Sequence, residues 1–346
     1  MTTETPKIAP LLPERHPQHE LFVCDVADAV LKDDMASMEH PFYSLSKKPD
    51  FTSRRYEHNG KTIEVKPSAR GLATIYDKDI LIYCISQIIA KSRDGAKPSK
   101  DISIVAQDML QFCNRTTGGK DYEALVEALE RLQGTQITTN IPTGGEIQTE
   151  IFSLIDRARL RRSDATDRIL ELRVTLSDWV FNAIQAQEVL TLHRDYFRLR
   201  RPLERRVYEI ARKHCGQQDQ WRVTVDLLKK KCGSRASMKE FRRLLRELVL
   251  GDHLPDYAVA WDADDLIVFF NRGTMRAKLE AAAVPYPVLD AETYQEARIV
   301  APGYDVYALE REWQAWWLDS GQPELNNPDK AFIGFCKRRH ARNPVA

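Results

Sequence analysis

WRVTVDLLKKKCGSRASMKEFRRLLRELVL (residues 221–250) predicts a short helix, a turn and a second helix whose two faces are chemically opposed. In the second helix, apolar residues recur at i, i+3, i+4 and i+7, which places them on one face. They are Phe241, Leu244, Leu245 and Leu248. Basic residues repeat this spacing on the opposite side. They form what we call the basic stripe: Lys239, Arg242, Arg243 and Arg246. Ser237 and Glu240 stand three residues apart and can form a capping box where this helix begins. Such a helix suits a DNA major groove, although an isolated stripe of this kind can equally be a solvated basic face.

Charge is distributed unevenly along the chain. The 346 residues carry a net charge of only +1 at pH 7. Residues 151–250, however, hold 23 Lys and Arg against 13 Asp and Glu, a net charge of +10, whereas residues 1–150 carry −4 and residues 251–346 carry −5. A basic block that contains the basic stripe is the electrostatic footprint of a protein that binds a polyanion.

Basic residues around the stripe extend the candidate DNA contacts. Within 221–250 the candidates are Lys229, Lys230, Lys231, Arg235, Lys239, Arg242, Arg243 and Arg246. Arg161 and Arg162 end a run of alternating arginines that fits phosphate contacts, with a charged strand edge that blocks aggregation as the alternative. The stretch 192–206 adds Arg194, Arg198, Arg200, Arg201, Arg205 and Arg206.

A helix, turn, helix and β-hairpin follow one another twice. The first copy consists of helices at 76–90, 103–113 and 120–133, strands at 135–141 and 146–156, and a turn at 142–145. The second consists of a helix at 201–216, the stretch quoted above, and a hairpin at 257–271. Asn59-Gly60 marks a further hairpin. This order is that of a winged helix, so the sequence predicts an α+β fold of two tandem winged-helix domains, 21–160 and 161–284. A flexible N-terminus (1–20) precedes them, and a linker with a helical C-terminal extension (285–346) follows.

The two second helices of these copies differ in charge. Helix 120–133 exposes Glu123, Glu127 and Glu130, with Arg131 among them, and carboxylates repel a phosphate backbone. We therefore expect the second domain to be the main DNA reader. The first is expected to be a protein interface, or a weaker DNA contact through Arg115 and Lys120.

Motifs for catalysis or cofactor binding do not emerge from the sequence. Thr117-Gly118-Gly119-Lys120 lacks the residues that a phosphate-binding loop requires, and the histidines show no metal-ligand spacing. The six cysteines form no C-x-x-C pair, there is no signal peptide, and the longest apolar run (79–90) is too short to span a bilayer. These features predict a cytoplasmic, non-enzymatic protein with reduced thiols, no cofactor and no membrane segment.

Residues 33–89 resemble a known family. The strings DDMASMEHPFYSLSKKPD (33–50), RRYEHNGKTIEVKPS (54–68) and GLATIYDKDILIYCISQ (71–87) are similar to the plasmid replication initiator protein A family of proteobacteria, with the similarity running from about 20 to 275. The resemblance implies two winged-helix domains, sequence-specific binding to double-stranded DNA at plasmid origin repeats, help in opening the duplex, and recruitment of host helicase or primase machinery. It also implies that the second domain reads DNA more strongly, while the first pairs in homodimers that repress their own promoter.

Two other functions remain open at this point. A two-domain transcriptional repressor would carry the same DNA contacts. A nicking enzyme would need a nucleophilic tyrosine, and Tyr208 is better explained as a core residue of an amphipathic helix. The tail after about 285 lies outside the resemblance. In the tail, Trp313, Trp316 and Trp317 favour helix packing, with a docking surface as the alternative.

Overall fold

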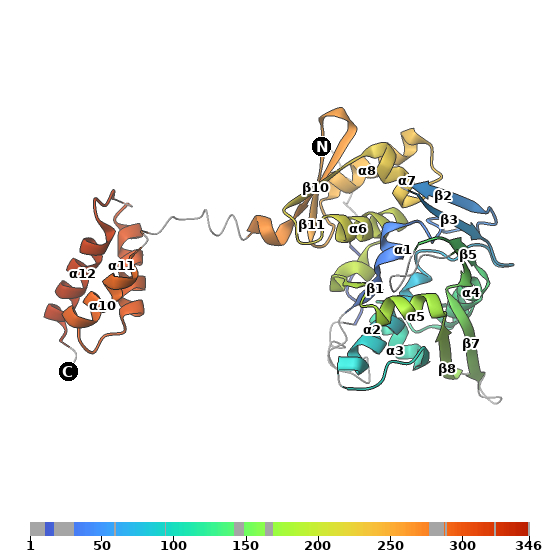
Figure 1. Ribbon diagram of the computed structural model, residues 1–346, viewed down its shortest axis with the longest axis horizontal. Coiled ribbons are helices and arrows are strands. Elements are labelled where there is room, and N and C mark those ends of the chain that lie inside the picture. The colour runs from blue at the N-terminus through green and yellow to red at the C-terminus, as the bar shows by residue number, and fades with distance from the viewer. Residues whose placement is uncertain are drawn as a thin grey trace, which may run out of the picture. The chain divides into compact units, whose positions relative to one another are not determined.

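Helices and antiparallel strands alternate along this chain and make it a mixed α+β protein (Figure 1). The computed structural model describes residues 11–16, 31–58, 60–93, 95–141, 149–162, 169–276, 287, 289–321 and 323–344. The chain divides into an N-terminal unit, residues 1–274, and a C-terminal unit, residues 275–346.

Capping residues fix where several helices of the N-terminal unit begin. The helices are α1 (Met35–Glu39), α2 (Lys78–Arg93), α3 (Ala106–Phe112), α4 (Gly119–Gly134), α5 (Asp178–Gln185), α6 (Pro202–His214), α7 (Val225–Cys232) and α8 (Met238–Gly251). Ser177, Thr224 and Ser237 each accept a hydrogen bond from the backbone N–H three residues later, which starts α5, α7 and α8. The predicted helices 76–90, 120–133 and 201–216 are thereby confirmed as α2, α4 and α6.

The strands of this unit form antiparallel sheets. They are β1 (Lys32–Asp34), β2 (Arg54–His58), β3 (Lys61–Lys66), β4 (Asp101–Ile104), β5 (Gln136–Thr139), β6 (Glu150–Ser153), β7 (Ile155–Arg162), β8 (Ile169–Leu176), β9 (Val189–Thr191), β10 (Gln220–Thr224), β11 (Tyr257–Asp262) and β12 (Leu266–Asn271). The helix predicted at 103–113 was wrong at its start. There, Ile102 and Ile104 are buried while Asp101 and Ser103 are exposed, and this period of two belongs to strand β4.

One arrangement of elements occurs twice. A helix, a strand, two helices and a hairpin occur in this order as α2, β4, α3, α4, β7 and β8, with β5 and β6 inserted after α4, and again as α6, β10, α7, α8, β11 and β12. The two three-stranded sheets share one order, β4-β8-β7 and β10-β12-β11, with the first strand of each beside the last. The duplication inferred from the sequence pattern is therefore present in the architecture.

The predicted hairpin at 135–156 has a different place from the one expected. Its strands β5 and β6 join β2 and β3 in a four-stranded sheet of order β2-β3-β5-β6, and β7–β8 occupies the position that β11–β12 has in the second copy. The expected domain boundary after residue 160 falls inside β7, which pairs with β8 as far as Arg162. The turn predicted at 142–145 lies outside the described residues. The hairpin β2–β3 is confirmed, with His58 opposite Lys61.

Part of the N-terminal segment is attached to the N-terminal unit. Leu11 forms a β-bridge with Leu199, and the Leu12 N–H donates to the Arg198 carbonyl at 2.8 Å. Glu14 pairs with Arg194 at 2.8 Å. Residues 11–16 therefore differ from the flexible N-terminus expected for 1–20, because backbone hydrogen bonds and an ion pair hold them.

The two copies share one hydrophobic core that encloses charged groups. Buried residues of both, such as Ile82 and Tyr208, belong to the same cluster. Within it the ammonium of Lys78 on α2 lies 2.6 Å from Asp33 and 3.1 Å from Glu209 on α6, and all three side chains are 0% exposed. Burial alone would lower the pKa of Lys78, but the two carboxylates raise it, so the ammonium stays charged.

Arginines of α6 complete this network, which we call the buried ion network: Asp33, Lys78, Asp79, Arg205, Arg206 and Glu209. Arg206 lies 3.0 Å from Glu209, and Arg205 lies 2.7 Å from Asp79 on α2. Arg205 and Arg206 were expected among the phosphate contacts, and that expectation was wrong, because both are 3% exposed. Paired charges thus link α2 of the first copy to α6 of the second.

Stability at mildly acidic pH provides a test of the burial of His40. His40 is 6% exposed, and burial lowers its pKa to about 4. The unfolded chain binds the proton near pH 6.5, so protonation favours unfolding as the pH falls from about 6.5 toward 4. We expect His40 to lower the free energy of unfolding by on the order of 1–2 kcal/mol between pH 7 and pH 5. Urea denaturation at the two pH values measures this change. If the free energy of unfolding fell by the same amount between pH 7 and pH 5 in the wild type and in His40→Gln, this expectation would be contradicted.

The C-terminal unit is a separate helical body with its own core. Its described helices are α10 (Ala291–Val300), α11 (Val306–Asp319) and α12 (Pro328–Arg342). Trp313 and Phe332 are 0% exposed and pack with ring centroids 5.4 Å apart. The linker expected at 285–303 was wrong over 291–300, because these residues form helix α10. Thr293 and Ala297 are buried on the face of α10 that packs against this core. Trp317 is also buried, whereas Trp316 is 48% exposed.

Candidate nucleic-acid interface

The stretch 221–250 folds into the predicted helix, turn and helix. Gly233 ends α7 in the left-handed conformation, with φ 65°, and Ser237 begins α8 by accepting from the Glu240 N–H at 3.2 Å. On the inner face of α8, Phe241, Leu245 and Leu248 are buried, and Leu244 is partly buried against them. The outer face of α8 therefore carries the basic stripe, as the periodicity predicts.

Neighbouring groups hold most of the basic stripe in place. Arg242 pairs with Asp265 in the β11–β12 turn, and Arg243 pairs with Glu240 and Glu247 on α8 itself. The guanidinium of Arg246 lies 5.1 Å from the centroid of the Trp261 ring on β11. Surface ion pairs of this kind are weak, so a phosphate or a base edge can replace the carboxylate partners. Lys239 is exposed and has no ion-pair partner among the described residues.

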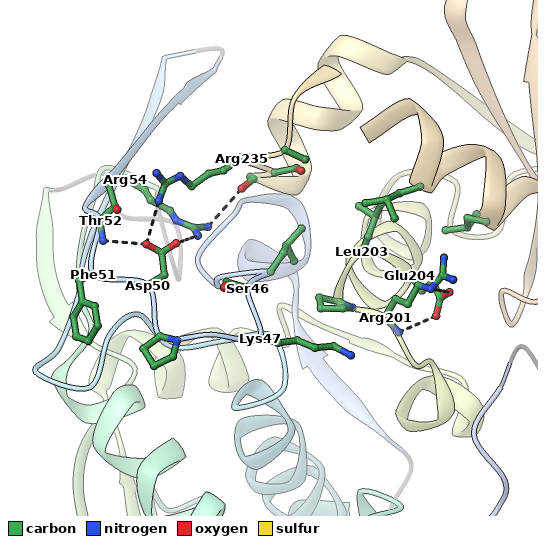
Figure 2. Close-up of a pocket in the computed structure, with 18 residues that line it drawn as sticks. Ser46, Lys47, Asp50, Phe51, Thr52, Arg54, Arg201, Leu203, Glu204 and Arg235 are labelled. Carbon is green, nitrogen blue, oxygen red and sulfur yellow. Dashed lines mark hydrogen bonds and ion pairs between the residues drawn. The ribbon is translucent and has the colours of Figure 1, made fainter. Parts of the chain in front are cut away.

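The α7–α8 turn is packed against the segment that precedes α2, which we count with the first copy because its strands β2 and β3 pair with β5. A Cβ atom at Gly233 would lie 2.6 Å from Pro41, so backbone and proline ring are in close contact. Asp50 binds Arg54 of β2 at 2.6 Å and Arg235 of the turn at 3.1 Å (Figure 2). Burial alone would raise the pKa of Asp50, but hydrogen bonds donated by Arg54 and by the Thr52 N–H, with the charges of Arg54 and Arg235, lower it, so this carboxylate is ionised. The first copy thus fixes the turn that leads into α8.

Clefts lie on both sides of this contact. One of about 910 Å³ is bounded by the 45–54 segment, the start of α6, the turn and the inner side of α8, and Figure 2 shows Asp50 bound to Arg54 and Arg235 at its wall. A second, of about 420 Å³, lies between β2 and α7 and reaches Met238 at the start of α8. Basic residues gather at this second cleft: Arg54, Arg55, Lys229, Lys230 and Arg235.

Some residues that the sequence placed on the surface instead direct their charged groups to partners inside the protein. Lys231 is 4% exposed, pairs with Glu39 at 3.5 Å, and burial lowers its pKa. Arg115 binds Asp79 at 2.7 Å and the Tyr76 carbonyl at 2.6 Å, because its guanidinium turns inward to the buried ion network. Arg131, expected to be exposed, forms two hydrogen bonds with Asp77, at 2.7 and 2.8 Å.

Other predicted contact residues are exposed but scattered. Lys230 on α7 and Lys120 on α4 are exposed, and Lys229 is half-buried. Arg161 and Arg162 are exposed on β7, where Arg161 lies 3.4 Å from Glu171. Strand β7 lies at the other end of the N-terminal unit from α8 (Figure 1). The structure therefore groups Lys229, Lys230 and Arg235 with the basic stripe and leaves Arg161 and Arg162 apart.

Sequence reasoning missed the residues that the first copy contributes. Asp50, Arg54 and Arg55 lie 170 or more residues before the turn they approach, and no periodicity links them to it. The one available signal was the adjacent pair Arg54-Arg55 at the start of a hairpin strand. Among the described residues, no helix is long and apolar enough to cross a membrane. No cluster of three or more His, Cys, Asp or Glu side chains suited to a metal occurs in those same ranges.

Comparison with known proteins identifies the family. Residues 32–259 match the family described as replication initiator protein A. A curated protein of Wigglesworthia glossinidia brevipalpis, named "Putative replication protein", is 36% identical over 258 residues, covering 73% of this chain and 94% of that protein. Among solved structures, domains 2 and 3 of RctB align with a TM-score of 0.49 and 11% identity, covering 67% of this chain and 94% of theirs. A structure of RctB residues 155–483 aligns with a TM-score of 0.48 and 12% identity, covering 70% and 99%. On the family match and the sequence identity, the chain belongs to the replication initiator protein A family.

Proposed function

We propose that this protein is a plasmid replication initiator that binds origin repeats through two tandem winged-helix units. Family membership supports the role in initiation. The observation that carries the DNA-binding mode is α8, a capped helix with a buried apolar face and a basic outer face beside the β11–β12 hairpin. In helix-turn-helix proteins the second helix enters the major groove while the first crosses the backbone. By this proposal α8 reads bases and α7 meets phosphates.

The first copy has a different task in this proposal. Its helix α4 exposes Glu123, Glu127 and Glu130, and Arg70 pairs with Glu130 at 2.8 Å. This acidic face suits a protein contact better than DNA, so we assign to it the homodimer that represses the protein's own promoter. Arg161, Arg162 and Lys120 supply weaker phosphate contacts. The initiator then works in the cytoplasm without a cofactor, helps to open the duplex, and recruits host helicase or primase machinery.

Binding to fragments tiled across the protein's own replicon tests the proposal. The expected result is one fragment with direct repeats that binds far above random competitor, with a steep dependence on salt from many phosphate contacts. Helicase or primase should then be retained on that fragment in the presence of the protein. Uniformly weak binding on every fragment would contradict the proposal. Specific binding without recruitment would favour a transcriptional repressor, and a strand break in the fragment would favour a nicking enzyme.

Replacing Arg242 tests which part of the DNA α8 contacts. If Arg242 leaves Asp265 to read a guanine edge, Arg242→Ala costs about 1–3 kcal/mol of specific binding and leaves binding to random DNA nearly unchanged. Competition binding with the origin fragment and a random duplex measures both. Arg298→Ala is the control, since Arg298 is an exposed arginine on α10 of the C-terminal unit, to which the proposal assigns no DNA contact. An equal loss on both duplexes would instead make Arg242 a phosphate contact.

A further inference from the structure

The cleft of about 910 Å³ along the inner side of α8, which we call the α8 cleft, has a largely apolar lining. Its walls are the 45–54 segment, the start of α6, the α7–α8 turn and α8 itself (Figure 2). Its apolar residues include Leu45, Phe51, Pro202, Leu203, Leu244 and Leu248. Ligand sites in proteins are concave and mostly apolar, with volumes of about 300–1,000 Å³. The α8 cleft has the size and the lining of such a site.

Phe51 leaves one wall of this lining open to water. It is 62% exposed, whereas Leu203 and Leu248 on the other walls are 8% and 2% exposed. Figure 2 shows Phe51 on the side of the 45–54 segment and Leu203 on the side of α6. A single exposed phenylalanine on a protein surface needs no explanation. Phe51 differs because it lines a cleft together with buried leucines, so an apolar group that enters the cleft also removes this ring from water.

Positive charge prevails among the polar residues of the α8 cleft. Its lining holds two carboxylates, Asp50 and Glu204, and four basic residues, Lys47, Arg54, Arg201 and Arg235. Asp50 already binds Arg54 and Arg235, and Glu204 lies 3.8 Å from Arg201. Lys47 is exposed and has no ion-pair partner in the described parts of the chain. In Figure 2 its side chain points from the 45–54 segment toward the side of α6. A carboxylate on an occupant of the cleft can therefore pair with the Lys47 ammonium.

Occupation of the α8 cleft leaves the basic stripe free. Successive residues of an α-helix are about 100° apart around its axis, and Arg246 is two residues from both Leu244 and Leu248. The two leucines that line the cleft therefore point away from the basic stripe, on the opposite side of α8. In the proposed function DNA lies against the stripe, so DNA and an occupant of the cleft can be bound at the same time. This geometry suits a partner that joins the protein on DNA.

We propose that the α8 cleft is the docking site for the replication protein that the initiator recruits, and that this partner inserts a large apolar side chain with a carboxylate beside it. The inference deepens the proposed function and rests on it. The apolar side chain lies between Phe51 and Leu203, and the carboxylate pairs with Lys47. A few anchors that fill a pocket carry most of the energy of an interface, so a short segment of the partner is sufficient. Because the walls come from both copies, neither winged-helix unit alone presents the site.

A fluorescent dye of the same chemistry tests the cleft without any partner. Anilinonaphthalene sulfonate combines an aromatic body with one anionic group, and it binds exposed apolar surface. The dye is titrated into the full chain as wild type, Phe51→Ala and Lys47→Glu. Each variant is expected to bind the dye about tenfold more weakly than the wild type. Equal dye binding by all three proteins would overturn the assignment of the cleft as a site for an apolar anion.

Matched controls carry the same kinds of substitution outside the cleft. Ile151→Ala truncates an apolar side chain that is 65% exposed on β6, and Lys66→Glu reverses an exposed charge on β3. Neither residue lines the α8 cleft, so both controls should bind the dye as the wild type does. Phe51 and Lys47 are themselves exposed, so their variants should unfold at the same temperature as the controls. Thermal unfolding of the four variants checks this.

Recruitment is then measured with purified host helicase and primase on the origin fragment. Phe51→Ala and Lys47→Glu should bind the origin as tightly as Ile151→Ala and Lys66→Glu, and should retain about tenfold less of the partner. Unchanged retention in both variants overturns the docking proposal. If their dye binding is weakened all the same, the occupant of the cleft is a small amphipathic anion. A wild type that does not bind the origin counts against the proposed function itself, whereas the dye titration still decides whether the cleft is a binding site.

Discussion

Replacing Lys78 with Met is expected to lower the free energy of unfolding of the N-terminal unit by about 3–5 kcal/mol. The Lys78 ammonium lies 2.6 Å from Asp33 and 3.1 Å from Glu209, and none of the three side chains reaches solvent. Removing the cation leaves the buried Asp33 carboxylate without its counter-ion, whereas Glu209 keeps Arg206 at 3.0 Å. Chemical denaturation of the full chain, followed by the fluorescence of its tryptophans, measures the change.

A matched control and a rescue variant distinguish lost pairing from lost volume. Lys66→Met makes the same substitution at an exposed position on β3 and should change stability by less than about 0.5 kcal/mol. Adding Asp33→Asn to Lys78→Met removes the charge that has lost its counter-ion and should restore part of the stability. A loss of stability in Lys78→Met that equals the loss in Lys66→Met would show that the buried ion network does not hold α2 and α6 together.

Replacing Trp313 with Ala is expected to unfold the C-terminal unit. Truncating a buried tryptophan costs about 3–5 kcal/mol, and a helical unit of this size has little stability to lose. Trp313 is 0% exposed and packs on Phe332 in a core that contains no residue of the N-terminal unit among those described. Hydrogen exchange of the full chain should show protection lost in α10, α11 and α12 and retained in α6 and α8.

Trp316 supplies the control on the same helix. It is 48% exposed, so Trp316→Ala should leave the protection of the C-terminal unit almost intact. If Trp313→Ala also removed protection from α8, the two units would not be independent. If both tryptophan variants left α10, α11 and α12 protected, the buried position of Trp313 would not contribute to their stability as proposed.

Local patterns in the sequence were sufficient for the segment that carries the candidate site. Ser237 and the apolar spacing of α8 predicted where the helix begins and the outward direction of the basic stripe. These features depend on neighbours within a few residues, and periodicity records such neighbours directly. The β11–β12 hairpin and helix α6, with Gly216 after its end, followed for the same reason.

Positive charge alone led to wrong predictions of DNA contacts for basic residues that the fold turns inward. Arg205, Arg115 and Lys231 are basic like the stripe residues, yet each turns inward to a carboxylate distant in the sequence. Arg206 also turns inward, to Glu209 on its own helix and to the Ser37 carbonyl. Arg205 meets Asp79, which precedes it by 126 residues. Sequence spacing within a helix says which residues share a face, and says nothing of an acidic partner brought there by another helix.

The sequence by itself determined the mixed α+β character, the helices α6, α7 and α8 with the β11–β12 hairpin, the basic outer face of α8 and the family to which the chain belongs. Only the tertiary structure decided which basic residues remain free for a ligand. It also placed β2 beside the α7–α8 turn and made one core of two copies. The physical reason is the distance along the chain over which each interaction acts. Helix capping and side-chain periodicity depend on residues a few positions apart, whereas the pairs Asp50–Arg235 and Lys78–Glu209 join segments that become neighbours only on folding.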